Sequence, residues 1–167
     1  MDKDTHIKEF TELIERNQGI LHKVSRMYCN EIKCREDLFQ DILLQLWKSF
    51  PNYDRNRKFS TWMYRVALNT AISQLRNNIK IDFISYYSID SVDKDESLEK
   101  NEQARVLHKA IGLLNKADKA IIILYMDDYS YEEISEIIGI SVSNVGVKIN
   151  RIKRKLQKLL KELGYGI

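Results

Sequence analysis

The stretch YSYEEISEIIGISVSNVGVKINRIKRKL, residues 129–156, has the pattern of two helices separated by a tight turn. Ser130 and Glu133 have the spacing of a capping box, in which the hydroxyl and the carboxylate each accept a hydrogen bond from a backbone N–H. Gly139 follows the first helical pattern and can take the left-handed conformation that a helix exit requires. Two short helices joined by a glycine-containing turn predict a helix-turn-helix.

The second helix of this unit combines an apolar stripe with a cationic face, and Ser141 or Ser143 is expected to cap its start. The stripe has three- and four-residue spacing and is predicted to face the core: Val145, Ile149, Ile152 and Leu156. The other positions are predicted to lie outside or at the flanks: Ser143, Asn144, Val147, Lys148, Asn150, Arg151, Arg154, Lys155 and Lys158. Such a face suits the major groove of DNA. A solvated, lysine-rich helix that binds nothing is the alternative interpretation.

The N-terminal part of the chain also predicts helices. Residues 36–50, EDLFQDILLQLWKSF, have one apolar stripe at helical spacing: Leu38, Ile42 and Leu46. PNYDRNRK at 51–58 breaks this helix, and another helix is expected at 59–77, with Phe59 and Trp62 in the core. The break combines cations with aromatic neighbours, which is the combination that binding of a single-stranded nucleic acid requires.

Charge is distributed unevenly along the 167 residues. The formal net charge is +3, but residues 1–81 carry 14 bases and 10 acids, whereas residues 82–103 carry two bases and seven acids. Residues 104–167 are again basic, with 11 bases and seven acids. Two basic blocks that flank an acidic middle indicate a polyanionic partner at both ends.

The acidic middle is predicted to be a linker, because it is rich in serine and aspartate and has little helical period. The apolar run AIIILYM at 120–126 resembles a buried strand, but it lies inside a longer helical pattern and is assigned to a helix. The sequence therefore predicts an all-α fold of two small helical domains. The first domain is expected at residues 5–81 and is predicted to be a bundle of three or four helices. The second is expected at residues 104–163, and the linker at residues 82–103 joins the two.

Several classes of protein are disfavoured by what the sequence contains. Cys29 and Cys34 are too few for a disulfide framework and have no zinc-binding companions, so we expect two reduced, partly buried thiols and no metal site. No stretch approaches the roughly 20 apolar residues that span a bilayer, and the first ten residues have no signal core, which predicts a cytoplasmic protein without membrane insertion. No glycine-rich phosphate loop or nucleophile elbow is present, so neither a cofactor nor catalysis is predicted.

Residues 129–156 resemble region 4 of the sigma-70 family of RNA polymerase initiation factors, specifically of its extracytoplasmic-function group. The stretches EDLFQDILLQLWKSF and FSTWMYRVALNTAISQLR, with the basic loop between them, resemble region 2. The resemblance covers about residues 10–80 and 104–160, in the family's order. It implies an alternative sigma factor that binds core RNA polymerase, through the β′ clamp helices and the β flap, and promoter DNA. An anti-sigma factor is a common partner in the family.

The resemblance also implies roles for individual residues. Core-polymerase contacts fall to Asp37, Gln40 and Asp41. Contacts to the −10 element, including a pocket for a flipped base at Tyr53 and Asn69, fall to Tyr53, Arg55, Arg57, Lys58, Arg65 and Asn69. Contacts near the −35 element, with the cations of the outer face, fall to Ser143, Asn144, Lys148, Asn150, Arg151, Arg154 and Lys155. The chain departs from the family at Gly146 and Val147, where polar or basic residues are common, and at Asn115, where proline is common.

Three other functions compete with this interpretation. A helix-turn-helix regulator that binds duplex operator DNA without polymerase would account for residues 104–160 but would leave the N-terminal block unexplained. An enzyme acting on nucleic acid would need clustered carboxylates in a pocket, whereas Asp127–Asp128 and Glu132–Glu133 have the pattern of exposed helix ends. A pure protein-interaction adaptor would have no use for two separate basic surfaces.

Overall fold

The structure, a computed structural model, describes residues 2–77 and 102–165, apart from the side chains of 75–77. Within these ranges the chain is helical with short connections, and no strand is present. It forms two compact units, which confirms the predicted all-α fold. The predicted linker, residues 82–103, lies outside the described residues up to position 101. Its last two residues already belong to a helix, which begins at Glu102.

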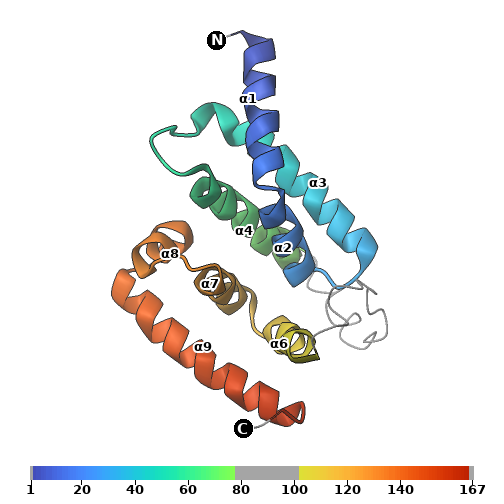
Figure 1. The fold of residues 1–167 in the computed structure, drawn as a ribbon, viewed down its shortest axis with the longest axis vertical. Coiled ribbons are helices and arrows are strands. Elements are labelled where there is room, and N and C mark those ends of the chain that lie inside the picture. Colours follow the sequence, from blue (N-terminus) through green and yellow to red (C-terminus); the bar gives the residue numbers. More distant parts are fainter. Residues whose placement is uncertain (1, 78–101, 166–167) are drawn as a thin grey trace. The chain divides into compact units, whose positions relative to one another are not determined.

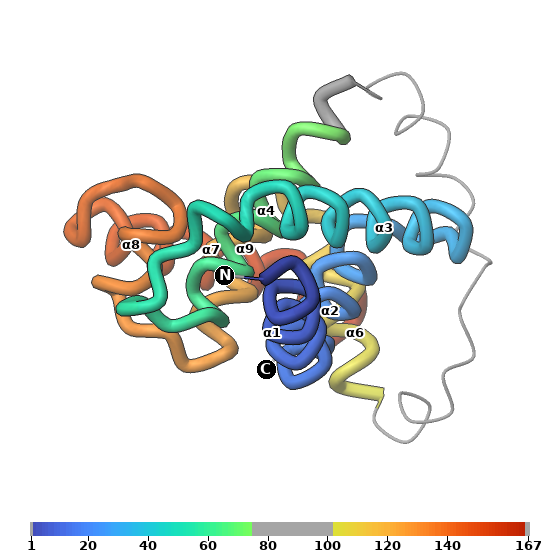
Figure 2. The backbone as a smooth tube through the Cα atoms, turned by 90° about the horizontal axis from the view of Figure 1, so that it is seen from above, coloured from blue at the N-terminus to red at the C-terminus, as the bar shows by residue number. Residues whose placement is uncertain are grey.

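The N-terminal unit is built from four α-helices and a short 3-10 turn. They are α1 (Lys3–Arg16), α2 (Gln18–Tyr28), α3 (Ile32–Ser49), η1 (Phe50–Asn52) and α4 (Phe59–Asn77). Helices α2, α3 and α4 pack against one another, and α1 extends from α2 beyond this bundle (Figure 1). Figure 2 looks along α1 and shows α3 running across it. The predicted stripe of α3 is confirmed, since Leu38, Ile42 and Leu46 are buried.

The core prediction for helix α4 is confirmed at Phe59 but not at Trp62. The buried residues of this helix are Phe59, Met63, Tyr64, Ala67, Leu68 and Ala71. Phe59 is therefore in the core as expected, whereas Trp62 is only half-buried. The reason is an aromatic cluster at the start of the helix, where the Trp62 ring lies 5.0 Å from that of Tyr53 and 5.3 Å from that of Phe59. Trp62 covers this cluster instead of entering the bundle.

The C-terminal unit contains α6 (Glu102–Gly112), α7 (Lys116–Met126), α8 (Tyr131–Ile138) and α9 (Val142–Glu162). Helix α9 contacts the other three and forms the long side of the unit (Figure 1). The apolar run at 120–126 is helical, as predicted, and five of its residues are buried. The predicted stripe of α9 is also confirmed, with Val145, Ile149, Ile152 and Leu156 buried.

The predicted signals for the helix ends are confirmed around the turn between α8 and α9. The Ser130 hydroxyl accepts from the Glu133 N–H at 3.1 Å, and the Glu133 carboxylate accepts from the Ser130 N–H at 2.8 Å. Gly139 has a φ of 82°, the left-handed conformation that ends α8. Ser141, and not Ser143, caps α9 by accepting from the Asn144 N–H at 3.2 Å.

The expectation of two reduced thiols is wrong for this structure, in which Cys29 and Cys34 form a disulfide. Helix α2 ends at Tyr28 and α3 begins at Ile32, and this tight corner brings the two Cα atoms to 5.6 Å. That separation is within the usual range for a disulfide. The number of cysteines does not show that the chain turns sharply between them, so the count alone could not predict the disulfide.

Across the helices that are described, we find none that is both long and apolar enough to cross a lipid bilayer.

Candidate functional sites

Helix α9 carries all seven residues predicted to lie near the −35 element. Six are exposed: Ser143, Asn144, Asn150, Arg151, Arg154 and Lys155. The seventh, Lys148, is half-buried. Because the buried stripe fixes how α9 is turned, these residues cover the outer face and the flank beside the start of α7. The unit thus presents an exposed helix whose polar side chains are available to the edges and phosphates of a DNA groove.

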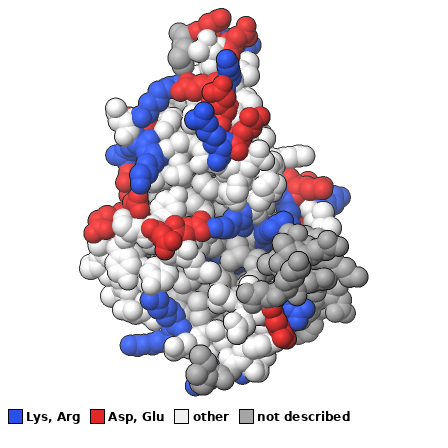
Figure 3. All heavy atoms as spheres, in the orientation of Figure 1, with Lys and Arg blue, Asp and Glu red and all other residues white. Residues whose placement is uncertain are grey.

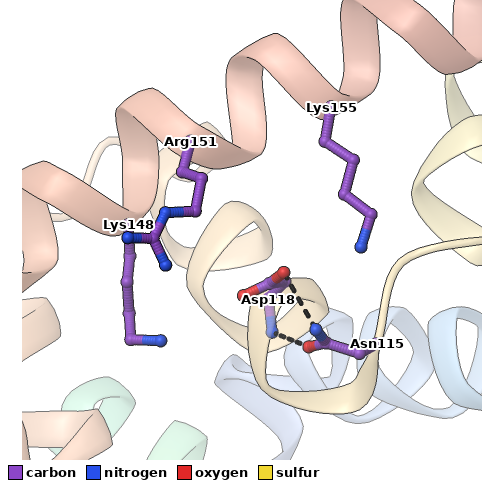
Figure 4. Close-up of a pocket in the computed structure, with 5 residues that line it drawn as sticks. All are labelled: Asn115, Asp118, Lys148, Arg151 and Lys155. Atoms are coloured by element: carbon purple, nitrogen blue, oxygen red, sulfur yellow. Dashed lines mark hydrogen bonds between the residues drawn. The ribbon is translucent and has the colours of Figure 1, made fainter.

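Three of the α9 cations converge beside the start of α7. Figure 4 shows Lys148, Arg151 and Lys155 extending from α9 toward Asn115 and Asp118, with which they line a pocket. Asn115 caps α7 by accepting from the Asp118 N–H at 2.8 Å and donates to the Asp118 carboxylate at 3.0 Å. The asparagine that replaces the family's common proline is therefore the N-cap of this helix. One carboxylate among three cations leaves the pocket with a positive balance.

Lys153, on the opposite flank of α9, is held by a tyrosine. Its Nζ donates to the Tyr125 hydroxyl at 2.8 Å and lies 4.5 Å from the centre of the ring. This hydrogen bond raises the pKa of Lys153 above its ordinary value. The Lys153 side chain thus joins α9 to the end of α7. It lies apart from the residues of α9 that are predicted to contact DNA.

Gly146 lies against the first helix of the helix-turn-helix. A Cβ added there would meet the Tyr131 ring at 3.5 Å, an ordinary van der Waals contact. The chain's own packing therefore does not require glycine at this position. Its neighbour Val147 is 54% exposed, so an apolar side chain stands on the outer face where the family commonly has a polar one.

The loop predicted to contact the −10 element is held by its own side chains. Tyr53 is buried, and its hydroxyl donates to the Arg57 carbonyl at 2.6 Å. Burial raises the pKa of Tyr53. The ring also contacts those of Phe50 and Phe59, at 6.1 and 5.4 Å between centroids. In this state Tyr53 closes the loop and does not line an open pocket.

The cations of this region are exposed, and both loop arginines have carboxylate partners. Arg55 pairs with Glu9 of α1, and Arg57 lies 3.8 Å from Asp54. Lys58, Arg65 and Asn69 are exposed, and the last two occupy one face of α4 because they are four residues apart. On the face drawn in Figure 3, basic and acidic side chains are interspersed over α1 at the top of the view. The surface here is of mixed sign.

The residues predicted to contact polymerase lie along α3. Asp37 and Gln40 are exposed, whereas Asp41 is half-buried and accepts a hydrogen bond from the Gln74 side chain of α4. Sequence reasoning missed Leu44, which is 47% exposed one turn after Asp41. Its three- and four-residue spacing from the predicted contacts was a signal that could have identified it. The face is therefore acidic at its start and apolar further along.

Two further residues were missed for a different reason. Glu9 and Gln74 act through partners that are 46 and 33 residues away in the chain. No local pattern marks either position, so only the folded arrangement identifies them.

Comparisons with known proteins match both units. Residues 13–80 match the family described as sigma-70 region 2, and residues 104–156 match the one described as sigma-70, region 4. The ECF RNA polymerase sigma factor SigW of Bacillus subtilis is 27% identical over 169 residues, which cover 92% of this chain and 90% of the relative.

Two solved structures share the fold. One is the sigma factor RpoE in complex with the anti-sigma factor NepR from Bartonella quintana, with a TM-score of 0.75 and 22% identity. The alignment covers 92% of this chain and 98% of that one. The other is CnrH in complex with the cytosolic domain of CnrY, with a TM-score of 0.65 and 22% identity over 93% and 89% of the two chains.

Proposed function

We propose that this chain, which belongs to the extracytoplasmic-function group of the sigma-70 family, is an alternative sigma factor. It binds core RNA polymerase and directs it to specific promoters. The observation that carries this conclusion is the presence of both units on one chain, in the family's order: a region 2 bundle and a region 4 helix-turn-helix. A duplex-binding regulator would need only the second unit.

We assign a separate role to each of the two units. We assign residues 5–81 to region 2, residues 82–103 to the linker and residues 104–163 to region 4. The exposed polar face of α9 supports −35 recognition, in which we assign Asn144, Asn150 and Arg151, all exposed, to the base edges. Lys148 and Lys155, with Arg151, form a positive flank for the phosphates that border the groove.

Region 2 has two tasks in this proposal. The start of α3 binds core polymerase through Asp37, Gln40 and Asp41, with Leu44 extending the face. The loop and the exposed face of α4 bind the −10 element through the cations described above. For Tyr53 to line the pocket of a flipped base, the loop has to open, because the ring is buried and its hydroxyl is engaged.

Sigma factors are transcription initiation factors, and the phosphodiester chemistry belongs to the polymerase. We assign no catalytic step, cofactor or metal to this chain, and we place its action in the cytoplasm, where core polymerase and promoter DNA are found. An anti-sigma factor is an expected partner. One of the two similar structures is of a sigma factor in complex with an anti-sigma factor.

Native gels test this function by comparing the mobility of the chain with and without core polymerase. We expect the chain to migrate with core and a promoter fragment to be shifted only by the complex. A chain that ignores core but shifts duplex DNA by itself would be a helix-turn-helix regulator, and our assignment of region 2 would be wrong.

A further inference from the structure

We propose that Cys29 and Cys34 are a reversible thiol–disulfide pair through which an oxidant tightens the binding of core polymerase to α3. The inference rests on the proposed function of that helix. The pair lies outside the residues assigned above to polymerase or DNA, yet it is built into the corner from which the polymerase-binding helix starts.

Hydrogen bonds at this corner, in addition to the disulfide, keep the two sulfur atoms near each other. Cys29 is 4% exposed, and its N–H donates to the Ser25 carbonyl at 3.0 Å. Its own carbonyl accepts from Nε of Arg35 at 2.9 Å. These bonds hold the backbone of Cys29 against α2 and α3 independently of the disulfide. The thiols of a reduced chain therefore stay within reach, so that the bond can form again.

Cys34 has the surroundings of a reactive thiol. It is the third residue of α3, where free backbone N–H groups and the helix dipole favour a thiolate. Lys33 and Arg35 are its neighbours in sequence, with Glu31 and Glu36 close by on either side. The side chain is half-buried, so a small oxidant can reach it, whereas Cys29 is shielded. Cys34 is thus the attacking thiol and Cys29 the resolving one.

The oxidant that fits is a hydroperoxide. The Cys34 thiolate attacks one peroxide oxygen and breaks the O–O bond, which gives a sulfenic acid and, from hydrogen peroxide, one water after protonation. The Cys29 thiol then attacks the sulfenic sulfur, forms the S–S bond and releases a second water. Two electrons pass from the two sulfurs to the peroxide, and both thiol protons end in water. A dithiol reverses the change by two exchange steps.

The bond affects polymerase binding through the first turn of α3. Asp37 follows Cys34 by three residues, so it lies one turn further along the helix. The disulfide ties this turn to the end of α2 and restricts the fraying that is usual at helix ends. Reduction removes this covalent tie and leaves the weaker hydrogen bond from Arg35 to the Cys29 carbonyl, so that part of the ordering of Asp37 must take place when polymerase binds. Asp41 is less affected, because Gln74 of α4 holds it independently.

The proposal is tested by measuring the affinity of the full chain for core polymerase in its reduced and its oxidised state. One sample is reduced with dithiothreitol and the other treated with hydrogen peroxide, and free thiols are counted by maleimide labelling and intact mass. We expect no free thiol after peroxide and an affinity for core at least about threefold higher than that of the reduced chain. Dithiothreitol should restore the weaker value.

The double variant C29S/C34S is the matched control. It should bind core like the reduced chain and ignore peroxide; if it does not fold, the comparison of the two wild-type states stands by itself. A folded chain that keeps both thiols under peroxide, or equal affinities of the two states, would overturn the inference while leaving the sigma assignment intact. If neither state binds core, the proposed function itself has failed.

Discussion

Arg55 in the −10 loop and Glu9 in α1 form a two-point ion pair, with Nε 2.9 Å from Oε1 and Nη2 2.8 Å from Oε2. This is the geometry in which a guanidinium also binds a phosphate. A DNA phosphate that is to use Arg55 must therefore displace the Glu9 carboxylate. Helix α1 thus holds a cation of the proposed −10 surface in a neutralised state.

Glu9→Gln is expected to raise the affinity for single-stranded −10 DNA. The variant removes the competing charge and leaves a side chain of the same shape, and exposed ion pairs are weak, so the gain should be about two- to fivefold. Fluorescence anisotropy of a labelled −10 oligonucleotide with the holoenzyme measures it. Glu12→Gln, three residues further along α1 and exposed, is the control. Equal gains from both variants would show a general charge effect and not competition for Arg55.

The same pair predicts a dependence of stability on pH. The hydrogen bond from Arg55 lowers the pKa of Glu9 below its ordinary value of 4.5. Its contribution to stability is therefore fully present above that value and is lost as the pH falls through the lowered pKa. Denaturant unfolding of the wild type and of Glu9→Gln should differ at neutral pH and converge in acid. A difference that stays constant into acid would contradict the pairing.

Gln74→Ala is expected to weaken the binding of core polymerase although Gln74 itself belongs to α4. Loss of its hydrogen bond frees the Asp41 side chain, which should cost about two- to fivefold in affinity. Asp41→Arg reverses the charge at the contact and should cost more than about tenfold. Filtration binding to core measures both. Unchanged binding by Gln74→Ala would show that Asp41 needs no positioning from α4.

Arg151→Ala should weaken promoter use and spare the binding of core. The side chain is exposed beside the positive flank of α9, and its loss should lower the affinity of the holoenzyme for promoter DNA by about tenfold. Lys153→Ala is the matched control on the same helix, because Lys153 is engaged by Tyr125. Comparable losses in both variants would mean that α9 contributes only diffuse charge.

Gly146→Ala should stabilise the C-terminal unit. A Cβ at this position makes an ordinary contact with Tyr131, and alanine inside a helix is favoured over glycine by about 0.5–1 kcal/mol. Thermal unfolding followed by circular dichroism measures the change. If promoter affinity falls while stability rises, glycine is kept there for close approach of DNA to the backbone.

Local signals predicted the helices of this chain well. The capping box at Ser130 and the left-handed Gly139 depend on residues within one or two turns, so the sequence contains all that is needed to place them. The buried stripes of α3 and α9 follow from helical period in the same way. The position of the helix-turn-helix could therefore be predicted from the order of its residues alone.

Contacts between distant segments could not be predicted. The Glu9–Arg55 pair and the Gln74–Asp41 bond join different helices, and nothing in either local stretch indicates its partner. The orientation of Trp62 was predicted from helical period alone, whereas an aromatic cluster spanning η1, the loop and α4 decides it.

Run-off transcription from a library of promoter fragments, by core polymerase with and without this chain, tests the central claim most directly. We expect the chain to direct initiation at a defined subset of fragments that core alone does not use, and Arg151→Ala to reduce that initiation. Transcription that is the same with and without the chain, while the chain shifts duplex DNA by itself, would contradict the assignment as a sigma factor.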